Sequence, residues 1–163
     1  MLVKGRIWCF GDDVNTDIIF PGKYTYSIKE PEEMAKHAME DADPEFAANV
    51  REGDVIVAGS NFGCGSSRQQ AVTSLKYAGI RAIIAKSFAR IYYRNTINLG
   101  LLAIINSEIS EIAKNGDLIE IDTDKGIVLL NGKTFTYPSF PEYITKIINA
   151  GGLIPFVRDN IKK

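Results

Sequence analysis

A glycine-rich stretch, residues 59–68, holds the side chains with the clearest chemical potential in this chain. It ends with the hydroxyls of Ser66 and Ser67 beside the guanidinium of Arg68. Glycines permit backbone conformations that are closed to other residues, and they let a ligand approach closely. We predict that Ser66 or Ser67 caps a helix with Arg68 in its first turn. The helix N-terminus and the arginine then both favour negative charge, which predicts an anion site.

The same stretch also has a purely structural interpretation. Glycine-rich turns between a strand and a helix are common, and paired serines often cap a helix without any role in catalysis. The stretch is not a P-loop, because no Gly-Lys-Ser/Thr follows, and it lacks the Gly-x-Ser-x-Gly pattern of a nucleophile elbow. On the loop alone, the structural interpretation stays ahead of the functional one.

Strands and helices alternate around this stretch. Short apolar runs rich in β-branched residues predict buried strands, and capping residues and a closing glycine mark the helices between them. The expected order is strand 54–58, helix 68–78, strand 80–85, helix 88–98 with Ser87 as its N-cap, and strand 101–105. This alternation predicts an α/β fold with a largely parallel central sheet and flanking helices.

The remaining chain adds elements on both sides of this central unit. Before it we expect a strand at 2–10, a polar loop at 15–17 and helices at 30–39 and 43–53. After it we expect a short helix at 108–114, a β-meander between 118 and 137, and helices at 141–150 and 153–161. Asn131-Gly132 is a strong hairpin signal inside the meander. No repeat or linker interrupts the sequence, so we expect one domain over residues 1–163.

Composition excludes several classes of protein. The formal net charge of -1 over 163 residues argues against binding to nucleic acid, which needs a basic surface. No apolar run approaches the roughly 18 residues of a membrane helix, and no signal peptide is recognised at the N-terminus. Cys9 and Cys64 give no disulfide framework. A cytoplasmic protein without a membrane contact is the expectation.

Four segments together resemble a known family. They are Asn61 to Arg68, Ala82-Ile83-Ile84, Ser87-Phe88-Ala89-Arg90-Ile91 with Asn95, and Gly100-Leu101-Leu102. They resemble the C-terminal swivelling domain of the aconitase superfamily. With Asn15-Thr16-Asp17-Ile18-Ile19, the chain is similar to the separate small subunits of 3-isopropylmalate dehydratases. The resemblance covers residues 5–155 and implies a swivelling β/β/α domain, here with the meander added.

The resemblance also implies an activity and roles for individual residues. These subunits belong to hydro-lyases that interconvert 2- and 3-isopropylmalate through 2-isopropylmaleate, in leucine biosynthesis. By motif position, Ser66 is the base, acting as an alkoxide, and Asp17 faces histidines of the large subunit. Ser67 and Arg68 bind the small anionic hydroxy-acid substrate, Arg68 through a carboxylate. By its residue type alone, Asp17 is better explained as a turn residue whose carboxylate caps local N–H groups, and only the resemblance favours the active-site role.

The superfamily's [4Fe–4S] cluster cannot be held by this chain alone. Such a cluster needs about three or four cysteine thiolates, whereas this chain has two, far apart in sequence. We therefore expect the cluster on the partner large subunit, in a heterodimer or heterotetramer, and no metal on this chain. His37, the only histidine, has no second ligand at a suitable spacing.

One loop is expected to cover the variable group of the substrate. Its candidate residues are Tyr24, Thr25, Tyr26 and Ser27. By the resemblance, relatives that bind an extra carboxylate have arginine at the position of Tyr26. A tyrosine cannot form that ion pair, which favours an apolar or mixed pocket that suits isopropyl. The positive charge of Lys23 is compatible with a more acidic substrate, so one alternative is a homoaconitase or dual-specificity subunit for homocitrate and homoaconitate. A second alternative is a non-catalytic anion-binding module.

Overall fold

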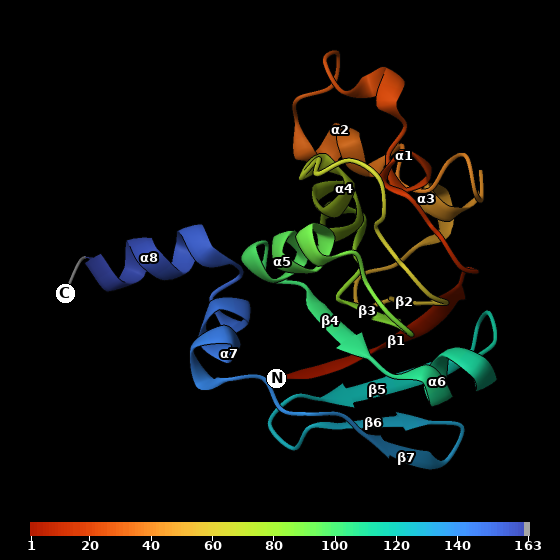
Figure 1. Cartoon of the computed structure of the whole chain (residues 1–163), viewed down its shortest axis with the longest axis vertical. Helices are drawn as coiled ribbons and strands as arrows, with labels where there is room; N and C mark the ends of the chain where they lie inside the picture. Colours follow the sequence, from red (N-terminus) through yellow and green to blue (C-terminus); the bar gives the residue numbers. More distant parts are fainter. Residues whose placement is uncertain (162–163) are drawn as a thin grey trace.

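The computed structural model describes residues 1–161, which are built on a seven-stranded sheet in the order β4-β3-β2-β1-β5-β6-β7. The strands are β1 (Leu2–Cys9), β2 (Val55–Ala58), β3 (Ala82–Ala85), β4 (Leu102–Ile105), β5 (Leu118–Asp122), β6 (Ile127–Leu130) and β7 (Lys133–Thr136). Strands β1 to β4 pair in parallel, and the meander β5–β7 pairs antiparallel on the other side of β1 (Figure 1). The predicted α/β fold is confirmed. The meander extends the central sheet instead of forming a separate appendage.

Strand β1 joins the two halves of the sheet because its two ends have different partners. Residues 2–6 pair antiparallel with β5, whereas residues 7–9 pair in parallel with β2. Gly5 lies where the halves meet, and a Cβ atom there would stand 2.1 Å from the Gly53 carbonyl oxygen. Glycine is therefore required for this close backbone approach. The carboxyl end of β1 then delivers its loop to the same edge as the loops after β2 and β3.

Helices cover the parallel half of the sheet. The helices of the described chain are α1 (Thr16–Ile19), α2 (Pro31–Ala35), α3 (Phe46–Asn49), α4 (Gln70–Ala78), α5 (Arg90–Asn98), α6 (Ser107–Ile112), α7 (Glu142–Asn149) and α8 (Leu153–Ile161), with a 3₁₀ turn at η1 (Gly22–Tyr24). Successive strand residues point to opposite faces, so Ile56 and Ile83 join one core with α1, α2 and α4, while Val57 and Ile84 join a second core with the meander. Helix α8 extends away from the body, as Figure 1 shows. Among residues 1–161, no helix is long and apolar enough to span a membrane.

Both predicted serine caps are wrong. Helix α4 begins at Gln70 with Gln69 at the N-cap, so neither Ser66 nor Ser67 caps it. Helix α5 begins at Arg90, while the Ser87 hydroxyl oxygen accepts the backbone N–H of Asn61 at 2.8 Å. The Ser66 and Ser87 hydroxyls, which were predicted to cap these helices, instead form hydrogen bonds to other segments of the chain.

The expected polar loop at 15–17 instead begins a helix. Asn15 is the N-cap of α1, and its side-chain oxygen accepts the backbone N–H of Ile18 at 2.9 Å. The helices expected at 30–39 and 43–53 shorten to α2 and α3. Each short helix depends on packing for its stability, because a single turn is marginal in water.

Asp54 is a buried carboxylate at the opposite edge of the sheet from these loops. It is 2% exposed and accepts the Trp8 indole N–H at 2.9 Å, the Arg6 and Arg51 backbone N–H groups at 3.0 Å each, and an Arg6 guanidinium N–H at 3.1 Å. Burial by itself raises the pKa of Asp54, but the donors outweigh it and hold the pKa below its ordinary value. The ionised carboxylate therefore ties β1 to β2.

We expect Asp54→Asn to lower the free energy of unfolding at pH 7 by about 2–4 kcal/mol, because the amide turns a donor toward groups that themselves donate. A lowered folded-state pKa gives stability that is present above about pH 4 and is lost as the pH falls through the folded pKa. The difference between wild type and variant should therefore shrink in acid. Urea unfolding at pH 7, 5 and 3 measures this, with the exposed Asp41→Asn as control. A difference that does not change with pH would contradict the argument.

Candidate active site at the carboxyl ends of the parallel strands

Three loops lie side by side where β1, β2 and β3 end. The Gly63 N–H donates to the Val14 carbonyl at 2.8 Å, which joins the loop after β2 to the loop after β1. The Phe62 N–H donates to the Ser87 carbonyl at 3.0 Å, which joins it to the loop after β3. The glycine-rich stretch is therefore fixed from both sides before any ligand binds.

Two glycines of this stretch are required by packing. Gly63 has φ +80°, and a Cβ atom there would stand 2.0 Å from the Tyr92 ring of α5. A Cβ atom on Gly59 would stand 1.9 Å from the Asp12 carboxylate. The glycines thus make room for side chains of the protein itself, whereas the sequence predicted that they make room for a ligand. It lets the loop lie flat on α5 and on the loop after β1.

Two polar side chains lie against the Ser66 hydroxyl oxygen. The Arg68 Nε–H donates to it at 3.0 Å, and the Thr16 hydroxyl oxygen lies 3.0 Å from it. The Ser66 backbone N–H donates to the same Thr16 hydroxyl at 3.2 Å. The serine is exposed on its other side. A charged guanidinium and a neutral hydroxyl therefore converge on one accessible oxygen.

Arg68 connects three other predicted site residues. Besides Ser66, its guanidinium donates to the Thr25 hydroxyl at 2.9 Å and to the Asp17 carboxylate at 2.7 Å. It also donates to the Phe20 carbonyl at 3.0 Å. The Arg68 side chain is only 18% exposed, whereas Asp17 is 73% exposed. The arginine is thus held from within the chain, and its ion-pair partner stands in solvent.

The predicted residues of the 24–27 loop face either the protein or the solvent. Gln70 donates to the Thr25 carbonyl at 3.0 Å, so the 24–27 loop is tied to the start of α4. Tyr24 turns inward, with its ring 4.1 Å from the His37 ring, while the next tyrosine, Tyr26, is 89% exposed. Ser27 is also exposed. The loop is therefore anchored through Thr25 and presents Tyr26 outward.

Ser67 lies outside the hydrogen-bond network that surrounds Arg68. Its side chain is exposed, and its carbonyl accepts the Asn95 side-chain N–H at 3.3 Å. Arg90 is exposed and forms no ion pair within residues 1–161. Sequence reasoning did not single out Thr16, Gln70 or Asn95 as contacts of this site. Thr16 stood inside the Asn-Thr-Asp motif, but only the tertiary fold reveals that it is buried against Ser66.

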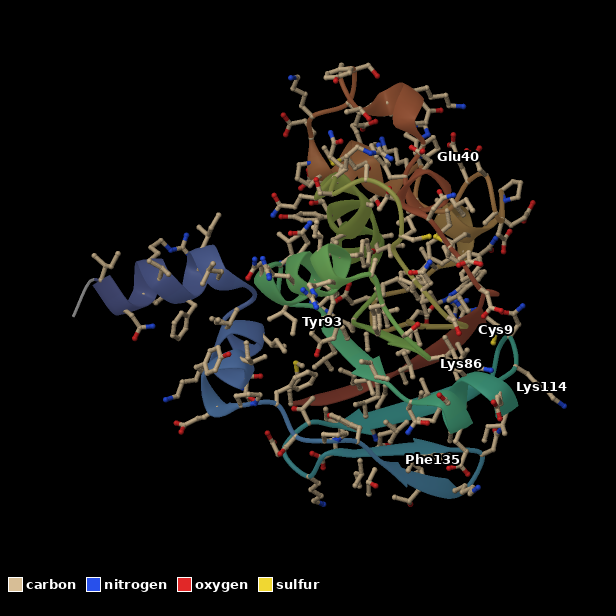
Figure 2. All side chains as sticks on the ribbon, viewed as in Figure 1. Cys9, Glu40, Lys86, Tyr93, Lys114 and Phe135 are labelled. Carbon is tan, nitrogen blue, oxygen red and sulfur yellow. The ribbon has the colours of Figure 1, made fainter. Side chains whose placement is uncertain are left out.

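The described residues do not fit an iron–sulfur cluster. Cys9 lies beside the segment that carries Lys114 (Figure 2), and its thiol donates to the Ala113 carbonyl at 3.4 Å. Burial first, and then the negative charge of Asp117, raise the pKa of the Cys9 thiol, which disfavours the thiolate that ligates metal. Within residues 1–161, no three His, Cys, Asp or Glu side chains gather as a metal site. His37 is instead paired with Glu40 at 2.7 Å.

Comparison with known proteins identifies the family of this chain. The aconitase C-terminal domain model matches residues 15–108. The 3-isopropylmalate dehydratase small subunit of Nautilia profundicola is 51% identical over 164 residues, covering 99% of this chain and 98% of that protein. The chain belongs to the 3-isopropylmalate dehydratase small-subunit family. The family resemblance seen in the sequence is therefore confirmed.

Two further dehydratase proteins support the assignment to this family, and a distant neighbour shares only the fold. Small subunit 1 of Methanopyrus kandleri is 48% identical, covering 96% of this chain and 93% of that protein. The crystal structure of the Methanocaldococcus jannaschii 3-isopropylmalate dehydratase superposes with a TM-score of 0.91 at 49% identity, covering 99% of this chain and 96% of that chain. Aconitase X of Thermococcus kodakaraensis, at 15% identity and a TM-score of 0.55 over 80% of this chain and 90% of that chain, is similar in fold alone.

Proposed function

We propose that this chain is the small subunit of a heteromeric hydro-lyase that interconverts 2- and 3-isopropylmalate through 2-isopropylmaleate, in leucine biosynthesis. Membership of the dehydratase small-subunit family supports the reaction. The observation that carries the proposal is the single Arg68 network, which gathers Ser66, Asp17 and Thr25 at one edge of the sheet. These residues supply a base and a binding site for the anionic substrate.

Ser66 is the proposed base that removes the substrate's C–H proton. A serine hydroxyl is ordinarily a poor base, so its oxyanion needs strong local stabilisation. The Arg68 Nε–H, 3.0 Å from the hydroxyl oxygen, supplies a charged donor at that position. The helix N-terminus that the sequence predicted there lies further along, because α4 begins at Gln70. The arginine, and not the helix dipole, is therefore the main stabilising charge.

Asp17 and Arg68 are proposed to exchange partners on assembly. In the isolated chain they pair at 2.7 Å, with the carboxylate on the exposed side. In the complex, Asp17 turns toward histidines of the large subunit, and the guanidinium N–H that it releases binds a substrate carboxylate. Ser67, exposed beside them, hydrogen-bonds the substrate or the loop. The ion pair thus keeps the arginine in place until the partner arrives.

The metal chemistry is proposed to belong to the large subunit. A [4Fe–4S] cluster bound there supplies the Lewis acid that assists departure of hydroxide. The residues that the structure describes fit no such cluster, so their part is to hold the proton and to bind and orient the anion. The division makes each subunit inactive without the other.

The 24–27 loop favours an uncharged substituent on the substrate. Tyr26, which is 89% exposed in this loop, has an uncharged side chain. Lys23, which kept acidic substrates open, is paired with Glu40 at 3.4 Å and lies 5.0 Å from the centre of the Tyr24 ring. The charge of this largely exposed side chain thus already faces a carboxylate of the same chain. This supports isopropylmalate over homocitrate.

Co-expression with the large subunit tests the proposal. We expect a cysteine-rich partner to co-purify and the complex to form 2-isopropylmaleate from 2-isopropylmalate, whereas each subunit alone is inactive. A panel on the same complex should show a kcat/KM for 2-isopropylmalate about 100-fold above that for homocitrate. Absence of both the partner and the activity would overturn the proposal. Anion binding without turnover in the complex would favour a binding module, and a preference for homocitrate would overturn the substrate.

A further inference from the structure

We propose that Thr16 is a positioning residue for Ser66 and donates the second hydrogen bond to its oxyanion. The inference rests on the proposed function, in which Ser66 is the base. Thr16 is one of very few polar side chains that are fully buried among the described residues, at 1% exposed. Its hydroxyl oxygen lies 3.0 Å from that of Ser66. A buried hydroxyl group lowers the stability of the fold unless its hydrogen is donated in a hydrogen bond.

The direction of the Thr16–Ser66 hydrogen bond follows from the other contact of Thr16. The Thr16 hydroxyl oxygen accepts the Ser66 backbone N–H at 3.2 Å. A hydroxyl has one hydrogen to donate, and its oxygen accepts through lone pairs. Within residues 1–161, the acceptor near this hydrogen is the Ser66 hydroxyl oxygen. When Ser66 is an alkoxide, Thr16 is therefore the donor.

Local structure holds Thr16 in place from both sides. Its backbone N–H donates to the Cys64 carbonyl at 2.9 Å, and its carbonyl accepts the Phe20 N–H at 2.9 Å. Gly65 has φ +101°, and a Cβ atom there would stand 3.3 Å from the Thr16 hydroxyl oxygen. A glycine at this position thus lets the loop close over the threonine without crowding. The contact between Thr16 and Ser66 is built by the backbone of both segments.

The chemistry needs two donors on one oxygen. The substrate's C–H proton transfers to the Ser66 oxyanion, the electron pair stays on the substrate carbon, and Ser66 becomes a neutral hydroxyl. Thr16 keeps its own proton throughout and only donates a hydrogen bond. The charged and titratable groups nearest Ser66 are Arg68 on the same loop, Asp17 on α1, which pairs with Arg68, and Cys64, two residues earlier in the chain. Of these, Arg68 donates directly to the serine oxygen, so Thr16 is the uncharged complement to it.

The test compares Thr16→Val and Thr16→Ser in the complete enzyme with its large subunit. Valine keeps the shape and removes the hydroxyl, so we expect kcat to fall about 10- to 100-fold with KM within about twofold. The pH at which kcat/KM reaches half its plateau should move upward by about one unit, because the alkoxide is less favoured. Thr16→Ser should restore kcat to within about threefold. If Thr16→Val unfolds, Thr16→Cys keeps the size with a weak donor and should still lower kcat.

Two comparisons separate this role from a structural one. Thr96→Val removes the hydroxyl of another fully buried threonine, which donates to the Tyr92 carbonyl at 2.8 Å, and should leave kcat within about twofold. In a Ser66→Ala background, Thr16→Val should cause no further loss of turnover, because its partner is gone. An active wild-type complex whose kcat and pH profile survive Thr16→Val overturns the Thr16 role alone. An inactive wild-type complex overturns the proposed function together with it.

Discussion

Ser66→Ala is expected to lower kcat of the assembled enzyme by about 10³-fold or more, because a positioned base typically contributes 10²–10⁴-fold and nothing else at this position takes up the proton. Folding and assembly should survive. The serine is exposed on one side, and the Arg68 Nε–H that donates to it is reached by water. Steady-state kinetics of the co-purified complex, with a melting curve of the same preparation, measure both effects.

Ser60→Ala is the matched control for the Ser66 variant. Ser60 lies in the same loop after β2, and its structural contact is made by its backbone N–H, which donates to Asp12 at 2.7 Å. Its side chain makes no hydrogen bond within residues 1–161, so turnover should stay within about twofold of wild type. A Ser66→Ala enzyme that keeps more than about a tenth of wild-type kcat would remove Ser66 from the role of base.

The strands and the bodies of the long helices follow from local patterns. The short apolar run before the glycines predicts β2, and helical spacing with a closing glycine predicts α4 through Gly79. These signals are local because burial on a sheet face or a helix stripe repeats every two or 3.6 residues. The meander followed from its turns in the same way, since Asn131-Gly132 joins β6 to β7. Its attachment to β1 is a long-range pairing that no local pattern encodes.

The helix starts were not predictable from the same signals. Ser87 has the side chain of a good N-cap, but its hydroxyl and its carbonyl both accept N–H groups from residues 61 and 62. Tertiary partners therefore compete with local capping, and the outcome depends on which loops meet. The same holds at Ser66, whose hydroxyl contacts Thr16 and Arg68 instead of the first turn of α4.

The motif supplied the members of the candidate site but not their contacts. Asp17 and Arg68 are 51 residues apart in sequence, and their ion pair depends on β1 and β2 ending at the same edge of the sheet. Gln70 donates to the Thr25 carbonyl, which gives the residue two positions after Arg68 a structural task. Sequence resemblance thus identifies residue types, whereas the order of strands decides which of them touch. The assignment of roles to them stays a prediction.

Arg68→Lys tests whether the planar guanidinium, and not its charge alone, organises this site. Lysine retains the positive charge but cannot donate at once to Ser66, Thr25, Asp17 and the Phe20 carbonyl, as Arg68 does. We expect kcat/KM to fall about 10²- to 10³-fold, with kcat and KM both affected. The loss in kcat follows from the missing donor on Ser66. The rise in KM follows from the weaker grip on the substrate carboxylate.

A second arginine offers the matched control for this substitution. Arg81 precedes β3 at the opposite edge of the sheet, where its guanidinium pairs with Glu52 on the surface. Arg81→Lys makes the same chemical change far from the loops, so its kcat/KM should stay within about twofold of wild type. If Arg68→Lys were equally mild, a point charge near Ser66 would be enough, and the fixed geometry of the guanidinium would have no part in catalysis. A large loss confined to KM would place Arg68 in substrate binding and leave the stabilisation of Ser66 to Thr16.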